Sequence, residues 1–338
     1  MIATQRPWYI PESWVTSNGR PTSYLRALID DGGLEATFCT LALPNVPAKY
    51  RYEFSEGDIA LVWTYSRNSD VDGHIFKFNA RTGELLAQAK RPASVTGRGY
   101  SLARSSATWV EFEKNDRSWR VYQTPDVPLF EGVVEDSTAD TPVISDDGSL
   151  IAFFGLDNGV SILDAKTQAV VSHTGPLPHH WFYGEFSRCN RYFLFHGTDR
   201  ALQRLMLFAV QTSSGKLKNR GYQGVDLGYR GAVTFFSEPG DPHIYFVSDG
   251  GHCFYFDTDA KEFSGMYAPR LDEFERPLAW HLKDGVLYSV AENWVAAHSP
   301  SGSLLRTAPR PTESGRVKWS APQQRTESRR QNWKRWLR

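Results

Sequence analysis

Short runs of apolar residues, most of them about four to eight residues long, recur along the chain, and turn-forming residues separate them. The stretch from Pro142 to His173 reads PVISDDGSLIAFFGLDNGVSILDAKTQAVVSH and holds four such runs with a turn after each of the first three. Runs of this length, rich in β-branched and aromatic residues and bounded by Asp, Gly and Asn, are typical of strands. The stretch therefore predicts a unit of four antiparallel strands.

Three turn landmarks recur in the same order and place seven copies of this unit about 41 to 50 residues apart. In the first, Ser follows an apolar residue and a small residue comes three positions later; it begins at Phe54, Ile144, Phe186 and Phe236, with looser copies at Tyr9, Leu102 and His281. The second is a hairpin near Gly19, Gly73, Asn115, Gly159, Asp199, Gly250 and Asn293. The third, a turn before the last strand, starts at Ile29, Asn79, Gln123, Asp164, Gln211, Asp257 and Ser299. Ser, Asp and Asn favour such turns because their side chains bond to the nearby backbone.

The copies have approximate limits of 7–45, 46–92, 93–136, 137–176, 177–224, 225–270 and 271–310. Their second strands are nearly continuous apolar runs, namely DIALVWTY, TWVEFE, LIAFFG, RYFLFHG, HIYFVS and GVLYSV. A strand that is apolar on both faces has to be covered on both faces. A single small sheet cannot provide that cover, whereas sheets arranged radially cover one another. The pattern thus predicts an all-β fold, a seven-bladed β-propeller of four-stranded antiparallel blades.

This organisation resembles the WD-repeat and YVTN-repeat superfamily of propellers, over the chain from about Trp8 to Pro309. The Trp-Asp ending of the third strand is missing, and ILD, YFD and KFN end that strand instead, at Asp164, Asp257 and Asn79. We expect a propeller domain over residues 1–310 and a tail over 311–338. The segment RVKWSA, residues 316–321, is the candidate for a strand that pairs with an N-terminal blade and closes the ring.

Composition narrows the function classes without selecting one. The net charge is zero, which argues against a wholly basic nucleic-acid binder. Three widely spaced cysteines form neither a disulfide framework nor a zinc pattern, and the N-terminal residues contain no apolar signal segment, so we expect a cytoplasmic protein. No nucleotide-binding, calcium-loop or nucleophile-elbow motif is present, so no cofactor, metal or catalytic residue is predicted.

Long connectors between the repeats carry the candidate contact residues. The segments 90–100 and 218–231 combine Arg, Tyr and Gly, and residues 173–186 hold three histidines within HTGPLPHHWFYGEF. Arg and aromatic residues are enriched in protein interfaces because they combine a large contact area with a polar tip. The predicted partner-binding residues are Arg98, Tyr100, His179, His180, Trp181, Tyr222 and Arg230.

The C-terminal tail is strongly basic, with eight Lys or Arg after Ser314 against the single acid Glu327. Residues 327–338 predict a short helix on which Trp333, Trp336 and Leu337 share one face. Such a segment suits docking to a protein groove, or binding of nucleic-acid phosphates, and a membrane is the least favoured target. The predicted tail contacts are Arg329, Arg330, Trp333, Lys334, Arg335 and Trp336.

The sequence favours a non-catalytic protein-interaction scaffold, a subunit or adaptor of a larger cytosolic assembly. One alternative is a propeller enzyme of the hydrolase or lyase type, with a site at the channel mouth built from His179, His180, Asp136 and Glu185. The other is a nucleic-acid-associated subunit that binds through the basic tail. The sequence alone does not identify the partner.

Overall fold

In the computed structural model, the regular secondary structure of the described residues consists of β-strands. The described residues are 7–11, 15–16, 22–30, 32–44, 49–65, 72–92, 98–104, 106–134, 142–155, 159–177, 180–199, 204–223, 233–237, 240–248, 252–267, 279–299 and 303–321. Within these ranges, no helix is long and apolar enough to cross a membrane.

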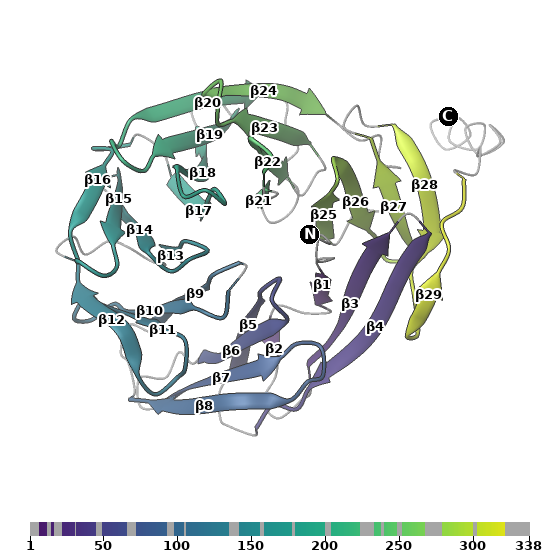
Figure 1. The fold of residues 1–338 in the computed structure, drawn as a ribbon, viewed down its shortest axis with the longest axis horizontal. Coiled ribbons are helices and arrows are strands. Elements are labelled where there is room, and N and C mark those ends of the chain that lie inside the picture. The colour runs from purple at the N-terminus through teal and green to yellow at the C-terminus, as the bar shows by residue number, and fades with distance from the viewer. Residues whose placement is uncertain are drawn as a thin grey trace, which may run out of the picture.

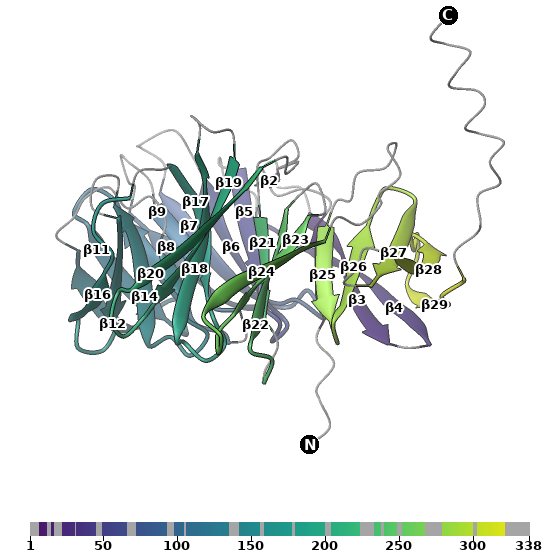
Figure 2. The ribbon, with the colours of Figure 1, turned by 90° about the horizontal axis from the view of Figure 1, so that it is seen from above.

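The strands form seven antiparallel sheets that stand like blades around a central axis (Figures 1 and 2). Six sheets have four strands, and the sheet of blade 2 has a fifth, because β2 (Val15–Thr16) pairs with its innermost strand. The predicted all-β, seven-bladed β-propeller is therefore confirmed. Apart from β2, neighbouring strands within blades 2 to 7 follow one another in sequence, which is the arrangement that short turns permit.

The strand bounds are as follows, from the innermost strand outward. Blade 2 contains β5 (Lys49–Phe54), β6 (Ile59–Tyr65), β7 (Gly73–Asn79) and β8 (Leu85–Arg91). Blade 3 contains β9 (Arg98–Leu102), β10 (Trp109–Glu113), β11 (Ser118–Tyr122) and β12 (Pro128–Val133). Blade 4 contains β13 (Val143–Ile144), β14 (Leu150–Gly155), β15 (Gly159–Asp164) and β16 (Val170–His173). Blade 5 contains β17 (His180–Phe186), β18 (Tyr192–Asp199), β19 (Arg204–Gln211) and β20 (Leu217–Gln223). Blade 6 contains β21 (Val233–Ser237), β22 (His243–Ser248), β23 (Cys253–Asp257) and β24 (Glu262–Tyr267). Blade 7 contains β25 (Ala279–Lys283), β26 (Val286–Val290), β27 (Trp294–His298) and β28 (Leu304–Pro309).

Blade 1 is built from both ends of the chain. Its strands are β1 (Trp8–Pro11), β3 (Thr22–Asp30), β4 (Gly33–Leu41) and β29 (Gly315–Val317). The C-terminal strand β29 pairs antiparallel with β4, with Arg316 opposite Glu35. A Cβ at Gly33 would collide with the carbonyl oxygen of Val317, so the close approach of the two strands requires glycine there. The ring is closed by this pairing between the first and last parts of the described chain.

The turns between the first and second strands follow from the serine landmark. The buried serine hydroxyl accepts the N–H of the residue near the start of the second strand, as for Ser145 with Leu150 at 2.9 Å and Ser187 with Tyr192 at 3.0 Å. The small residue three positions later has a positive φ, as at Asp58, Gly148, Asn190 and Gly240. Asp, Asn and Gly accept this left-handed conformation more readily than other residues do. These turns therefore have a uniform shape, and the residue after each serine occupies an equivalent position.

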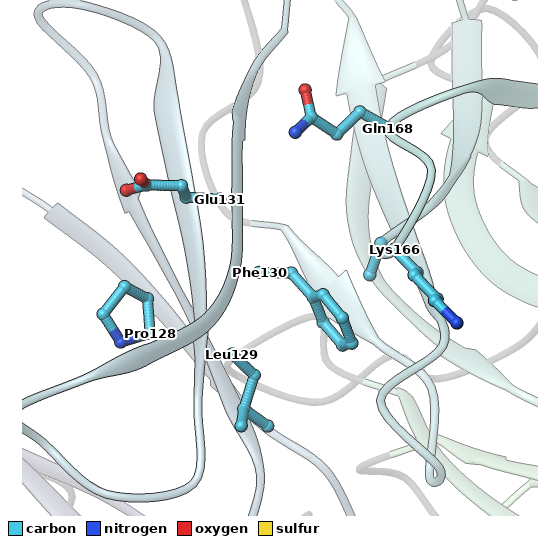
Figure 3. Close-up of a pocket in the computed structure, with 7 residues that line it drawn as sticks. Pro128, Leu129, Phe130, Glu131, Lys166 and Gln168 are labelled. Carbon is cyan, nitrogen blue, oxygen red and sulfur yellow. The ribbon is translucent and has the colours of Figure 1, made fainter.

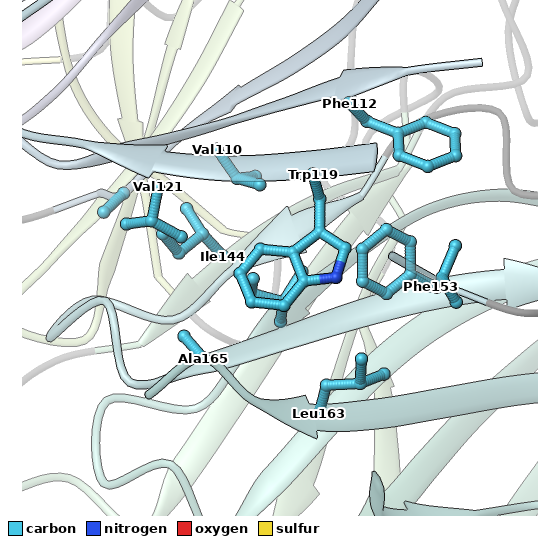
Figure 4. Close-up of a cluster of buried hydrophobic side chains, with 11 residues drawn as sticks. Val110, Phe112, Trp119, Val121, Ile144, Phe153, Leu163 and Ala165 are labelled. Carbon is cyan, nitrogen blue, oxygen red and sulfur yellow. The ribbon is translucent and has the colours of Figure 1, made fainter. Parts of the chain in front are cut away.

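The core lies between the blades. Each of the seven buried clusters draws its residues from two adjacent blades, including the pair of blades 7 and 1. Figure 4 shows the cluster between blades 3 and 4, where Trp119 lies among Val110, Phe112, Val121, Ile144, Phe153 and Leu163. Full burial of one such side chain contributes about 1.5–3 kcal/mol. The continuous apolar runs in the second strands are explained by this arrangement, because both faces of each sheet are covered.

Substitution of Gly132 by alanine is expected to lower the free energy of unfolding by about 1–3 kcal/mol, the usual effect of overpacking a filled core. A Cβ at Gly132 would lie 2.6 Å from Cζ2 of Trp119, and this indole is fully buried and has no room to move. Urea unfolding followed by tryptophan fluorescence measures the change. Val133→Ala is the control, because Val133 on the same strand is 63% exposed. Equal effects of the two substitutions would contradict the packing argument.

Candidate functional site at the channel mouth

The inner turns of blades 2 to 5 reach toward the centre of the ring (Figure 1). The residues that follow the turn serine, or its counterpart Ala103 in blade 3, are Glu56, Arg104, Asp146 and Arg188. Together with Glu185 near the end of β17, they form the cluster named here the channel network. Contacts between blades that are not neighbours have to run inside the ring, so this network lies at the central channel.

The guanidinium of Arg104 in blade 3 makes three contacts with other blades. Its Nε atom lies 3.0 Å from Oε1 of Glu56 in blade 2, and its NH1 group donates to Glu185 in blade 5. Its NH2 group donates to the carbonyl oxygen of Phe235 in blade 6 at 2.9 Å. One guanidinium therefore joins four blades, because its five N–H donors point in fixed and diverging directions.

The guanidinium of Arg188 in blade 5 also contacts three other blades. Its NH2 group lies 2.6 Å from Oε1 of Glu56, a residue 132 positions away in the sequence, and its NH1 group lies 2.6 Å from Oδ2 of Asp146 in blade 4. Its Nε atom donates to the carbonyl oxygen of Ser237 in blade 6 at 3.1 Å. The side chain of Arg188 is 11% exposed, so these charges are largely removed from water. Charge-assisted bonds of this kind stabilise the arrangement only while all partners are present.

Burial raises the pKa of Glu185 to about 7, and the nearby positive charge of Arg104 only partly offsets the loss of hydration. Glu53 on β5 has its pKa raised to about 7 for the same reason, and its Oε2 accepts the backbone N–H of Leu102 at 2.8 Å. Strongly shifted groups often mark functional sites, although structural ion networks shift them too. Burial thus raises the pKa of two carboxyl groups on the inner strands.

Two of the predicted contact residues lie between blades 2 and 3. Arg98, at the start of β9, approaches Glu111 at 3.3 Å and Glu113 at 2.7 Å, and it is 12% exposed. Tyr100 is 4% exposed, and its ring packs against Trp63 at 5.1 Å. In this position Arg98 balances buried carboxylates, and its substitution would affect stability as well as any contact with a partner.

The other predicted residues are distributed differently. Tyr222 lies on β20, an outermost strand, where its ring packs 4.2 Å from Phe254 of blade 6. His180 and Trp181 belong to β17, on the same strand as Glu185. The described residues do not include Asp136, His179, Arg230 or the tail residues Arg329, Arg330, Trp333, Lys334, Arg335 and Trp336. The structure thus brings Glu185 into the channel network, and it places Tyr222 on blade 5, away from Arg98 and Tyr100 on blade 3.

Sequence reasoning missed four of the five network residues. Their signal was present, because the residue after the turn serine, or after Ala103, is an acid, a base, an acid and a base in blades 2 to 5. A comparison of this position across the repeats would have indicated that the turns pair by charge. The serine and the small residue define the repeat, and the variable position between them carries the charge.

A pocket of about 280 Å³ lies on the outer side of the ring, between β12 and the turn after β15 (Figure 3). Phe130 points toward the turn that carries Lys166 and Gln168, whereas Glu131 points to the other side of β12. The pocket is thus a gap between two blade edges and has no set of converging reactive groups. Within the described ranges, no three His, Cys, Asp or Glu residues are placed to hold a metal ion.

Known proteins resemble this chain in fold and not in sequence. No known family model and no curated protein matches this sequence. Among solved structures, the computationally designed Ika8 protein aligns over 95% of this chain and 98% of its own, with a TM-score of 0.56 and 11% identity. The C-terminal WD40 domain of Sif2 aligns over 95% and 93%, with a TM-score of 0.55 and 8% identity. BamB from Moraxella catarrhalis aligns over 78% and 86%, with a TM-score of 0.48 and 13% identity. The chain is thus a seven-bladed β-propeller with a WD40-like fold, and the predicted resemblance is confirmed.

Proposed function

We propose that this propeller is a non-catalytic scaffold that binds protein partners. The observation that carries the proposal is the channel network, in which the converging charged groups of the channel mouth pair with one another. Glu185, one of the four residues of the enzyme alternative, is engaged by Arg104. A carboxylate held in this way serves to join blades, whereas a catalytic group needs access to a substrate.

The WD40-like fold also supports the proposal, because rigid blades present variable connectors at the ends of a ring. In this proposal the partner contacts are the connectors that hold His179 and Arg230, together with His180 and Trp181 at the start of β17. The protein is a cytosolic subunit or adaptor. The basic tail supplies a second contact, with a protein groove as its first target and nucleic-acid phosphates as the alternative.

Affinity capture from the native lysate tests the proposal with three forms of the protein. The full chain is expected to retain a stoichiometric protein partner, and a chain ending at Ala321 is expected to lose it if the tail makes the contact. Truncation at Ala321 is chosen because Gly315 to Val317 and Trp319 belong to the ring and have to be kept. The third form, the full chain with His179→Ala and Arg230→Ala, is expected to lose the partner if the connectors make the contact.

Lys216→Ala, just before the outer strand β20, is the matched control, because Lys216 is exposed and lies outside the candidate connectors and the tail. All these forms should keep the melting temperature of the full chain. Capture of a partner that none of the changes weakens would contradict the proposed contact sites. Retention of nucleic acid that falls steeply with salt and requires residues 322–338 would favour the nucleic-acid alternative instead.

A further inference from the structure

The C-terminal part of the described chain leaves the ring at the outer edge of blade 7. Ser320 pairs with Thr307 of β28 through two backbone hydrogen bonds, of 2.8 and 3.0 Å. β28 is the outermost strand of its blade, and this pairing is antiparallel (Figure 1). Pro322 has no N–H to donate, so it cannot continue the pairing as a full hydrogen-bonded pair. The chain after Ala321 therefore starts beside the part of β28 that precedes Thr307.

Two exposed leucines lie on that part of β28. Leu304 is 41% exposed, and Leu305 is 46% exposed. Because the pairing is antiparallel, a chain that runs on from Ser320 passes Leu305 first and Leu304 next. This apolar pair thus lies next to the point at which residues 322–338, named here the end segment, begin.

We propose that the end segment folds back onto the edge of β28 and covers Leu304 and Leu305. The end segment lies outside the described residues, and its sequence predicts one apolar face among cations. The side chains that cover the leucines are those of this face, Trp333, Trp336 and Leu337. A protein partner that binds the tail then has to displace it from β28 first, and this consequence rests on the proposed function.

The length of the end segment favours this nearby edge as its binding surface. Residues 322–332 separate the paired Ser320 and Ala321 from Trp333, and a random coil of that length spans about 20 Å on average. Tethering over such a distance gives an effective concentration on the order of 1 mM. A contact with a dissociation constant of about 0.1 mM is then formed roughly nine times in ten. Such an equilibrium changes the melting temperature of a chain of this size by only about 1–2 °C.

The charges of the end segment and of the rest of the chain are complementary. The whole chain has 38 basic and 38 acidic residues, and the end segment contains six Lys or Arg and the single acid Glu327. Residues 1–321 therefore carry an excess of five negative charges. Attraction between the two parts favours the docked form, and salt weakens this attraction by screening.

Trypsin cleavage of the purified full chain tests the proposal. Cleavage after Arg329 and Arg330 is expected to be about tenfold slower than in a synthetic peptide of residues 322–338, because the docked segment has to open before the protease binds it. The double variant Leu304→Thr, Leu305→Thr should lose this protection and keep the strand, since Thr is β-branched. Cleavage of the native chain at the rate of the free peptide would overturn the proposal.

The double variant Leu85→Thr, Leu86→Thr is the matched control. These two leucines occupy the same place on β8, at the start of an outermost strand, and they are 42% and 46% exposed. The control should keep the protection of the native chain, and equal loss of protection in both double variants would overturn the proposed site. Protection that rises with protein concentration would mean that the end segment covers a second copy, which would overturn docking within one chain.

Methyl NMR of the full chain locates the contact without a change in β28. The ring currents of tryptophan shift the resonances of methyl groups that touch the ring. The double variant Trp333→Ala, Trp336→Ala should therefore shift the methyl resonances of Leu304 and Leu305 and leave those of Leu85 in place. Unchanged Leu304 and Leu305 resonances would overturn the proposal. Since neither experiment contains a partner, that result would leave the proposed scaffold function intact.

Discussion

Replacement of Arg104 by methionine is expected to lower the free energy of unfolding by about 3 kcal/mol or more at pH 7. The substitution removes the contacts to Glu56 and Glu185 and the bond to the Phe235 carbonyl oxygen. Methionine keeps much of the side-chain volume, so the loss measures charge and hydrogen bonding rather than a cavity. Loss of one partner from a buried ion pair typically costs about 3–5 kcal/mol, because the remaining charge stays buried without compensation.

Thermal and urea unfolding of the variant measure this loss, with Arg120→Met as the matched control. Arg120 also pairs with a glutamate, Glu131 at 3.3 Å, but both side chains lie at the outer surface, and exposed pairs contribute at most about 1 kcal/mol. The double variant with Glu185→Gln should recover part of the loss, since the second change removes one of the stranded charges. A loss for Arg104→Met no larger than that for Arg120→Met would mean that the network does not hold the inner turns.

Removal of the closing strand is expected to have the second large effect. A chain that ends at Glu313 lacks β29 and Trp319. Its free energy of unfolding should be lower by about 3 kcal/mol or more, because the pairing of β29 with β4 and the packing of the half-buried Trp319 are lost together. Trp319 is half-buried and packs against the cluster between blades 7 and 1, and its Nε1 donates to the carbonyl oxygen of Asp30 at 3.2 Å. Arg316 adds an ion pair with Asp30 at 2.8 Å.

The control for this truncation is the chain that ends at Ala321, which keeps β29 and Trp319 and should melt at the temperature of the full chain. The shorter chain should also associate in gel filtration, because the edge of β4 becomes available for pairing with another chain. Equal melting temperatures of the two truncated chains would show that ring closure does not depend on the C-terminal strand.

Blade 1 illustrates how far the repeat pattern can be followed. The landmark at Ile29 predicts the turn before the fourth strand, as in the other copies. In the structure, the turn after Asp30 joins the second strand β3 to the third strand β4, and β29 supplies the fourth. The residues of a turn predict that two strands are joined, but they do not predict the positions of these strands in the sheet. In blade 1 the positions depend on β29, a strand far away in the sequence.

The second strand of each of blades 2 to 7, in contrast, was predictable from the sequence. The six apolar runs predicted for this position coincide with β6, β10, β14, β18, β22 and β26, each next to the innermost strand of its blade. Their apolar character on both faces is a local property of the sequence and follows directly from radial packing. The serine turns were predictable for the same reason, since one hydroxyl and one positive φ close each turn between residues that are close in the chain.

The sequence by itself determined the number of blades, the strand order within blades 2 to 7 and the shape of the turns, because these depend on hydrophobic periodicity and on bonds between residues close in the chain. Only the tertiary structure decided that Arg104 and Arg188 meet Glu56, Asp146 and Glu185, that Arg98 balances buried glutamates, and that β29 completes blade 1. The physical reason is the closure of the ring. It brings together turns that are separated by up to 132 residues, and it buries their charges in a small volume where each charge requires a partner.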